Sequence, residues 1–340
     1  MTIRGRPTSL DIAHLAGVSQ PTVSRALRGS PMVNEETRRR ILAIAEQLNY
    51  KVDKNASNLR AQQSGTLALL FFEDPAPDDS MINPFFHSML GSITRACARH
   101  GYDLLVSFQQ LSHDWHADFE DSHKADGLIL LGYGDYLESR TRLEQLVARG
   151  TRFVRWGAAL EGQPGVSIGC DNFQGGLDMG RHLVSRGYRR VAFLGDATDH
   201  YPEFRERHRG FAQALAKAGL EADPALVQRA ISSEEAGHAA AGRLLDSGVA
   251  FDAVFAASDL IAIGALRALA EHGLRVPADV ALAGFDDIPM ATMTSPALTT
   301  VQQDTKVAGA LLVEALIAMI RGEPVQTRSL PVRLVVRDST

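Results

Sequence analysis

The sequence contains few cysteines and no long apolar run. Its two cysteines, Cys97 and Cys170, show no metal-ligand spacing, which favours free thiols over a disulfide framework or a zinc site. No apolar run is long enough to cross a membrane, and the polar, basic residues 1–6 do not form a secretory signal. These absences predict a cytoplasmic protein that has no membrane segment.

Motifs of catalysis are also missing. The sequence has no nucleophile elbow, phosphate-binding loop or zinc-protease motif, and its serines and histidines are scattered. The Gly-Tyr-Gly run at 132–134 lacks the third glycine of a dinucleotide loop, so we interpret it as a turn after a strand. His113, His116 and His123 fit no metal-site spacing and are interpreted as part of a solvated loop. We therefore expect no enzyme, no metal and no cofactor.

Charge is unevenly distributed along the chain. Residues 1–64 contain ten Lys or Arg and five acidic residues, so they carry +5, whereas the whole chain carries −5 and residues 65–340 therefore carry −10. A basic head on an acidic body concentrates the attraction for phosphates at one end and keeps DNA away from the rest. At 340 residues, 45% of them hydrophobic, the chain is long enough for two or three domains.

Residues 8–28 have the pattern of two short helices joined by a tight turn. Thr8 and Ser19 are suitable N-caps, Asp11 occupies the capping-box position after Thr8, and Gly17 can end the first helix in a left-handed conformation. The second helix would then display polar residues, as a helix that reads the major groove does. The small core expected beneath it consists of Leu10, Ala13, Ala16, Val18, Val23 and Leu27.

A third helix and a hinge complete the N-terminal part. Asn34 is a good N-cap, and Ile41, Ile44, Ala45 and Leu48 recur at helical spacing after it. Residues 51–64 are polar and contain one large apolar residue, so packing alone cannot hold them in a helix. We assign residues 1–50 to a helix-turn-helix DNA-binding domain and residues 51–64 to a hinge that orders on contact.

From residue 65 onward, apolar runs alternate with amphipathic stretches. This alternation predicts parallel sheets covered by helices on both faces, and the number of units favours two α/β lobes with a ligand cleft between them. We place the N-lobe at about 65–165 plus 296–322 and the C-lobe at about 166–295 plus 323–340. Expected strands are 66–72, 102–108, 127–131, 152–156, 191–195, 253–257 and 280–285, and expected helices are 85–101, 137–150, 175–187, 206–219, 236–248, 260–273 and 305–322.

An ordered series of short motifs runs along the whole chain. The head contains Asp11-Ile12-Ala13, Ala16-Gly17-Val18-Ser19 and Thr22-Val23-Ser24-Arg25, and the body contains Asn83-Pro84-Phe85-Phe86, Asp171-Asn172, Ser258-Asp259, Gly284-Phe285-Asp286-Asp287 and Leu298-Thr299-Thr300-Val301-Gln302-Gln303. In this order they resemble the lactose/galactose-repressor (LacI/GalR) family. The resemblance implies a homodimeric transcriptional regulator with a periplasmic-binding-protein-like body and a pseudo-palindromic double-stranded DNA operator.

The same resemblance assigns roles in DNA recognition. Gln20 and Pro21 take the specificity positions at the start of the recognition helix, and Arg25 takes the position of the family's base-reading arginine. Ala56 and Leu59 match the hinge, where the leucine wedges into the minor groove and kinks the duplex. Two hinge residues depart from the family pattern, because Val52-Asp53 stands where Pro-Asn is usual. The expected phosphate contacts are Thr8, Ser19, Thr22, Ser24 and Asn34.

In the body, the resemblance places small-molecule contacts between the lobes. A sugar pocket needs polar groups for vicinal hydroxyls and an aromatic face for the ring, whereas a purine needs two facing aromatics. Phe85 is the one aromatic clearly placed, so a sugar is favoured, and Trp115 and Trp156 are candidates for further stacking faces. The implied effector-binding residues are Phe85, Asp171, Arg207, Ser258, Asp259 and Asp286.

These expectations combine into one hypothesis about function. The chain is expected to repress carbohydrate-utilisation genes until a sugar effector changes the lobe orientation, separates the hinges and releases a palindromic operator. The alternative is a corepressed regulator that responds to a purine or a sugar phosphate. A sugar-binding transport component is a more distant alternative. A dimer is expected because no leucine heptad follows the last apolar stretch.

Overall fold

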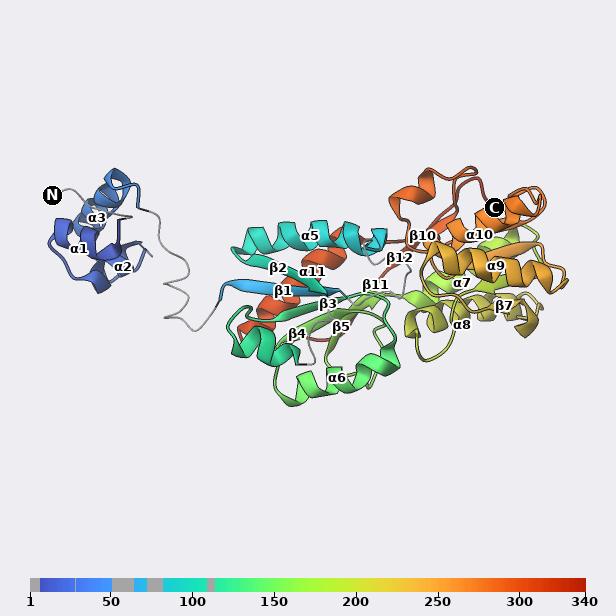
Figure 1. Ribbon diagram of the computed structural model, residues 1–340, viewed down its shortest axis with the longest axis horizontal. Coiled ribbons are helices and arrows are strands. Elements are labelled where there is room, and N and C mark those ends of the chain that lie inside the picture. Colours follow the sequence, from blue (N-terminus) through green and yellow to red (C-terminus); the bar gives the residue numbers. More distant parts are fainter. Residues whose placement is uncertain (1–6, 28, 51–63, 72–81, 109–113) are drawn as a thin grey trace. The chain divides into compact units, whose positions relative to one another are not determined.

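The computed structural model describes residues 7–27, 29–50, 64–71, 82–108 and 114–340 (Figure 1). Contacts divide the chain into two units, residues 1–64 and residues 65–340. The expected hinge contacts Ala56 and Leu59 lie outside the described residues. None of the described helices has both the length and the apolar composition needed to cross a membrane.

The first unit is a three-helix domain. Thr8 and Asp11 form the expected capping box at the first helix, and Gly17 ends that helix with a left-handed φ of 64°, a conformation that costs glycine little. Asn34 caps the third helix by accepting a hydrogen bond from the Thr37 amide at 2.8 Å. The helices are α1 (Ser9–Ala16), α2 (Gln20–Leu27) and α3 (Glu35–Gln47).

The core of this domain differs from the expected one at Leu10. The Leu10 side chain is 62% exposed, whereas Ile12 is fully buried against Val23 and Ile41. Two residues along a helix turn a side chain by about 200°, so Leu10 and Ile12 cannot share a face. The expectation for Leu10 was therefore wrong.

The N-lobe is built on a six-stranded, all-parallel sheet in the order β11-β5-β4-β3-β1-β2. Figure 1 shows α5 and α11 on one face of this sheet and α6 on the other. Its strands are β1 (Thr66–Phe71), β2 (Asp103–Phe108), β3 (Leu128–Leu131), β4 (Phe153–Trp156), β5 (Val166–Cys170) and β11 (Arg328–Leu330). Its helices are α5 (Pro84–His100), the π-helix η2 (His116–Asp121), α6 (Tyr136–Ala148) and α11 (Thr305–Ile320).

The C-lobe is built on a four-stranded parallel sheet in the order β7-β6-β8-β9. Helices α9 and α10 lie on one side of it, and α7 and α8 lie on the other (Figure 1). Its strands are β6 (Val191–Leu194), β7 (Val227–Gln228), β8 (Ala253–Ala256) and β9 (Ala281–Ala283). Its helices are α7 (Asn172–Ser185), α8 (Pro202–Lys217), η3 (Pro224–Leu226), α9 (Glu234–Asp246), α10 (Asp259–Glu271) and η4 (Pro289–Thr292).

Helices α7 and α8 approach each other closely, and this fixes the position of Arg207. Gly176 on α7 lies directly against the backbone carbonyl of Arg207 on α8, where any Cβ would collide with that oxygen. Close packing of two helix backbones requires glycine at such a contact. The backbone that carries Arg207 is therefore held firmly against α7.

Two strands, β10 (Thr300–Gln303) and β12 (Val332–Val335), pair antiparallel outside both main sheets.

The expected boundary between the lobes needs correction at two segments. Residues 166–170 and 328–330 were expected in the C-lobe. Both form strands of the N-lobe sheet, where β5 pairs with β4 and β11 pairs with β5. The loop 157–165 that leads from β4 to β5 contains no helix. A prediction based on alternating strands and helices therefore does not identify β5 as a strand of the N-lobe sheet.

Candidate functional site

The exposed face of α2 carries the expected base-reading residues. Pro21 and Arg25 are exposed, and Gln20 is half-buried with its Nε2 donating to Ser9 Oγ at 2.9 Å. Because Pro21 lies in the first turn of the helix, its missing N–H removes no helical hydrogen bond. The Gln20 amide is thus oriented by α1, and the Arg25 guanidinium extends from the last turn of α2.

Several expected phosphate contacts are also helix-capping residues. Thr8 caps α1, Asn34 caps α3, and Ser19 Oγ accepts from the Thr22 amide at 3.4 Å at the start of α2. Ser19 Oγ also shares a 2.9 Å hydrogen bond with Thr22 Oγ1. Helix N-termini attract phosphate through their free N–H groups and the helix dipole, so a capping role and a phosphate contact are compatible at these positions.

In the body, Arg207 is fully buried, and all three nitrogens of its guanidinium donate hydrogen bonds. Its Nε donates to Asn172 Oδ1 at 2.9 Å, its Nη2 donates to Tyr133 Oη at 3.1 Å, and its Nη1 donates to the Ala257 carbonyl. The guanidinium carbon also lies 3.8 Å from the centroid of the Phe285 ring. These contacts fix the guanidinium plane rigidly in the region between the lobes.

Asp286 is the buried anion of the same network. Its Oδ1 accepts hydrogen bonds from Gln303 Nε2 at 2.6 Å and from Tyr133 Oη at 3.2 Å, and lies 3.5 Å from Arg207 Nη1. Burial raises the pKa of this carboxyl to about 6, although the nearby arginine acts in the opposite direction. Asp286 adopts a φ of 119°, a strained conformation that this dense set of contacts holds in place.

Tyr133 joins the two lobes, although the sequence did not indicate a role for it. It follows β3 in the N-lobe, yet its hydroxyl contacts Arg207 and Asp286, both of which belong to the C-lobe. Its ring lies 6.2 Å from that of Phe85 with an interplanar angle of 11°. The sequence predicts only a turn at this residue. Its position at the carboxyl end of a parallel strand was the signal that could have identified it.

Gln303 and Asn172 are two further polar residues of this region, which occur in the sequence motifs but were not among the expected effector-binding residues. Gln303 is buried, and its Oε1 has no hydrogen-bond partner within the described part of the chain. Together with Phe85 and Asp286, Gln303 lines a cavity of about 870 Å³ that continues along α5 to the start of α11. A buried acceptor that borders a cavity is suited to receive a hydrogen bond from a ligand hydroxyl.

The other expected effector residues make contacts that support the fold. Asp171 caps α7, and Ser258 caps α10 through the Ile261 amide. Asp259 is fully buried, where its Oδ1 accepts from Thr300 Oγ1 at 2.6 Å and its Oδ2 accepts from the Ile288 amide at 2.9 Å. Burial raises the pKa of Asp259 well above its usual value. These three residues are not hydrogen-bonded to the network of Arg207 and Asp286.

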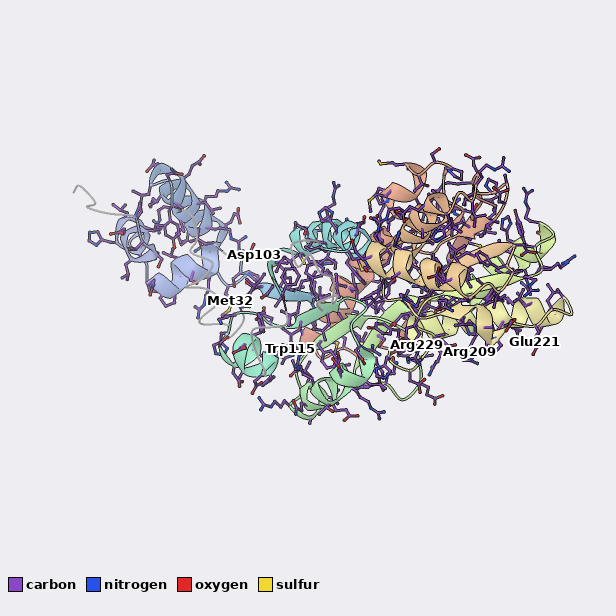
Figure 2. All side chains as sticks on the ribbon, turned by 45° about the vertical axis from the view of Figure 1, so that its right-hand side comes forward. Met32, Asp103, Trp115, Arg209, Glu221 and Arg229 are labelled. Carbon is purple, nitrogen blue, oxygen red and sulfur yellow. The ribbon has the colours of Figure 1, made fainter. Side chains whose placement is uncertain are left out.

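The two tryptophans lie in different places. Trp156 packs 6.0 Å from the Phe85 ring, beside the network. Trp115 belongs to a separate cluster with Phe153 and Leu143, at the end of the N-lobe that faces away from the C-lobe (Figure 2). Of the three histidines considered as metal ligands, His113 lies outside the described residues. His116 bonds to Thr151 at 2.8 Å, and no cluster of three or more potential metal ligands occurs among the described residues.

Fold and site together define a class of protein. A helix-turn-helix head precedes a two-lobed α/β body with a buried polar network between the lobes, which is the arrangement of a DNA-binding regulator controlled by a small molecule. Comparison with known families agrees. Residues 8–53 match "Bacterial regulatory proteins, lacI family", and residues 181–340 match "Periplasmic binding protein-like domain".

Full-length relatives extend this match. The chain is 32% identical to the HTH-type transcriptional regulator CelR of Thermobifida fusca, over 99% of this chain and 97% of CelR. It resembles the solved CelR–cellobiose complex, with a TM-score of 0.72 and 30% identity over 98% of this chain and 100% of that one. It also resembles the Lac repressor dimer bound to operator and the anti-inducer ONPF, with a TM-score of 0.81 and 25% identity over 98% and 99% of the two chains.

This chain belongs to the lacI family and is a helix-turn-helix transcriptional regulator. The expected family and the expected fold class are both confirmed. The relatives are transcriptional regulators rather than enzymes.

Proposed function

We propose that this regulator is a repressor whose operator binding is controlled by a sugar bound between the lobes. The observation that carries the proposal is the Tyr133–Asp286–Arg207 network, which combines a buried guanidinium, a buried carboxylate and aromatic rings. Charged planar groups bind vicinal hydroxyls in pairs, and aromatic faces cover the apolar side of a sugar ring. CelR in complex with cellobiose and a lacI-family regulator with bound ribose are among its structural relatives.

The network supports a mechanism of control. Tyr133 belongs to the N-lobe, whereas Asp286 and Arg207 belong to the C-lobe, so a sugar that competes for these groups changes the contacts that hold the lobes together. A ligand shifts a conformational equilibrium only by its difference in affinity for the two states. We infer that the regulator acts in the cytoplasm as a homodimer whose two heads bind a pseudo-palindromic operator. The sugar favours a lobe orientation in which the spacing of the two heads no longer matches that operator.

For DNA recognition, we propose that Gln20, Pro21 and Arg25 contact base edges. Their position on the exposed face of α2 supports this role, because arginine pairs with guanine and glutamine pairs with adenine in the major groove. Contacts to the phosphates of the DNA backbone set the register and orientation of the head on the duplex without reading its sequence. The proposed phosphate-contacting residues are Thr8, Ser19, Thr22, Ser24 and Asn34, and the proposed minor-groove residues are Ala56 and Leu59.

A purine effector is the second candidate. Phe85 and Tyr133 have nearly parallel rings at 6.2 Å, so the fold supplies the second aromatic face that the sequence did not reveal. A flat base would have to enter between these rings and move them apart. Corepression by such a ligand would oppose the direction of control proposed for a sugar.

A thermal-shift screen tests the proposal. The purified full chain is heated with ribose, glucose, cellobiose, a sugar phosphate, hypoxanthine and guanine, one at a time. A ligand that binds the native state raises the melting temperature in proportion to RT ln(1 + [L]/Kd). We expect a neutral sugar to raise it. Stabilisation by a purine alone would reject the sugar in favour of the second candidate.

A further inference from the structure

Arg155 is a buried arginine in the middle of the N-lobe sheet. It lies on β4 and is 6% exposed, with Nη2 donating to Gln163 Oε1 and the guanidinium 5.5 Å from the centroid of Tyr136. Its Nε is buried and has no hydrogen-bond partner in the described part of the chain. A buried N–H that stays unpaired is unfavourable, so a molecule that accepts a hydrogen bond from it would bind with an advantage.

Glu203 faces Arg155 from the other lobe. It lies in the first turn of α8, the helix that also carries Arg207, and its Oε1 accepts a hydrogen bond from the Ala158 amide at 2.7 Å. A Cβ placed on Gly157 would lie 2.9 Å from Arg155 Nη1 and 3.2 Å from Glu203 Oε1, so both charged groups converge over this glycine. The positive charge of Arg155 is thereby balanced by the negative charge of Glu203, and this favours an uncharged ligand group beside the two side chains.

A small cavity lies next to these two side chains. It has a volume of about 20 Å³ and is lined by Arg155, Glu203, Tyr136, Ser139, Leu143, Trp156 and the glycines on either side of Tyr133. A cavity needs roughly 10–15 Å³ to admit one water molecule, so this one has room for a single oxygen. Trp156 also packs against Phe85, so the cavity borders the network that contains Tyr133.

We propose that Arg155 and Glu203 form a second polar subsite of the effector cleft, which binds one hydroxyl group of the effector. The hydroxyl oxygen accepts a hydrogen bond from Arg155 Nε and its O–H donates one to Glu203, replacing a water that occupies the cavity in the effector-free protein. This inference rests on the proposed sugar response and sharpens it. The effector is then a polyol with hydroxyls on two sides of Tyr133, one set toward Arg207 and one toward Arg155.

The first test is a crystal structure of the full chain grown and frozen without sugar, glycerol or any other polyol. We expect an ordered water within hydrogen-bond distance of Arg155 Nε. An empty cavity, or a protein group bonded to that nitrogen, would overturn the subsite.

The second test compares R155M with R152M by calorimetry, using the sugar that most stabilises the wild type in the thermal-shift screen. Arg152 immediately precedes the same strand, but its side chain is 48% exposed and lies 3.5 Å from Glu120, so R152M is a matched control. We expect R155M to bind the sugar about tenfold more weakly, as loss of one buried charged hydrogen bond implies, and R152M to bind like the wild type.

Deoxy sugars separate a subsite from a structural role. Among the single-position deoxy derivatives of that sugar, we expect one that binds the wild type and R155M equally, because it lacks the hydroxyl that Arg155 contacts. E203Q should likewise bind this derivative as tightly as the wild type does. If the parent sugar, with all its hydroxyls, binds the wild type and R155M within twofold, the subsite alone is overturned. If no sugar binds the wild type, the proposed sugar response fails, and the subsite loses its assignment to the effector.

Discussion

Tyr133 of the N-lobe donates its hydroxyl proton to Asp286 of the C-lobe across 3.2 Å, and the same oxygen accepts a hydrogen bond from Arg207 at 3.1 Å. One phenol thus links an anion and a cation that are both buried. Few other side chains can do this, because the linking group must donate and accept while it packs against Phe85 and Phe86.

Removing this hydroxyl should weaken the body without unfolding it. Y133F keeps the ring but leaves Arg207 Nη2 and one acceptor site of Asp286 without their partner. We expect the free energy of unfolding to fall by about 1–3 kcal/mol, the cost of leaving buried polar groups unpaired. Urea denaturation monitored by circular dichroism measures it. Y102F is the control, since Tyr102 is only half-buried, and an equal loss in the two variants would contradict the special role of Tyr133.

Arg207 should be required for effector binding but not for DNA binding. R207M removes the guanidinium that orders Tyr133 and Asp286, so we expect the thermal shift by the effector to disappear while the operator is still bound. R209M is the control, because Arg209 lies on the same helix with a side chain that is 60% exposed and bonds to Glu206. Retained effector binding in R207M would remove this network from the proposed site.

Arg25 should contribute to sequence preference rather than to general attraction. R25A should relax the preference at one base pair of each half-site and cost about 1–3 kcal/mol there. Selection of binding sites from a random DNA pool, followed by competition against random fragments, measures both quantities. R39A is a control for simple charge loss, since the Arg39 side chain is 79% exposed on α3. If R25A and R39A reduce specific and random binding alike, base reading by Arg25 is refuted.

Asp286 should make stability depend on pH in a defined direction. Burial raises its pKa from 3.8 to about 6, so the folded protein holds this proton more tightly than the unfolded chain does. Its contribution to stability is therefore present below about pH 4 and is lost as the pH rises through about 6. In D286N this dependence is absent, so the stability of D286N relative to the wild type should improve between pH 4 and pH 7.

Asp279 provides a control of opposite sign for the same measurement. A side-chain hydrogen bond from Arg275 lowers the pKa of Asp279 to about 2, so its contribution is present above pH 4 and is lost on acidification. D279N should therefore lose stability relative to the wild type at pH 7 and recover it toward pH 2. A pH profile of D286N that parallels that of the wild type would show that Asp286 does not titrate as the structure implies.

The sequence predicted those features that depend on local patterns. Caps at Thr8 and Asn34 located two helices of the head, because a cap is a contact between residues close in the chain. Alternating apolar runs located β3, β6 and β8 with the helices that follow them, because buried parallel strands are continuously apolar. The strands β10 and β12 were missed, since each is only four residues long and they pair with each other rather than within a main sheet.

The candidate site was only partly predictable, because local patterns do not show which distant segments the fold brings together. Phe85, Arg207 and Asp286 were identified through motifs, and the structure brings them together around one network. Tyr133 was not inferred, because its hydroxyl acts through Arg207 and Asp286, which lie 74 and 153 residues away in the chain. Gln303 occurs in a motif, but its role depends on Asp286 and Tyr133, which the fold brings beside it. Ser258 and Asp259 also belong to a motif of the family, yet the Ser258 side chain caps α10 and the Asp259 side chain accepts a hydrogen bond from Thr300. A motif therefore locates the region of a site, and the fold decides which of its side chains face a ligand.

The central claim is that a small molecule between the lobes controls DNA binding by the head. Its most direct test is the fluorescence anisotropy of a labelled operator, selected from a random pool, titrated with the full chain in the presence and absence of the sugar that stabilises it. We expect the sugar to weaken operator binding by the wild type at least fivefold, the lower end of typical allosteric coupling, and to leave binding by R207M unchanged. Equal operator affinity of the wild type with and without a sugar that demonstrably binds it would contradict the account.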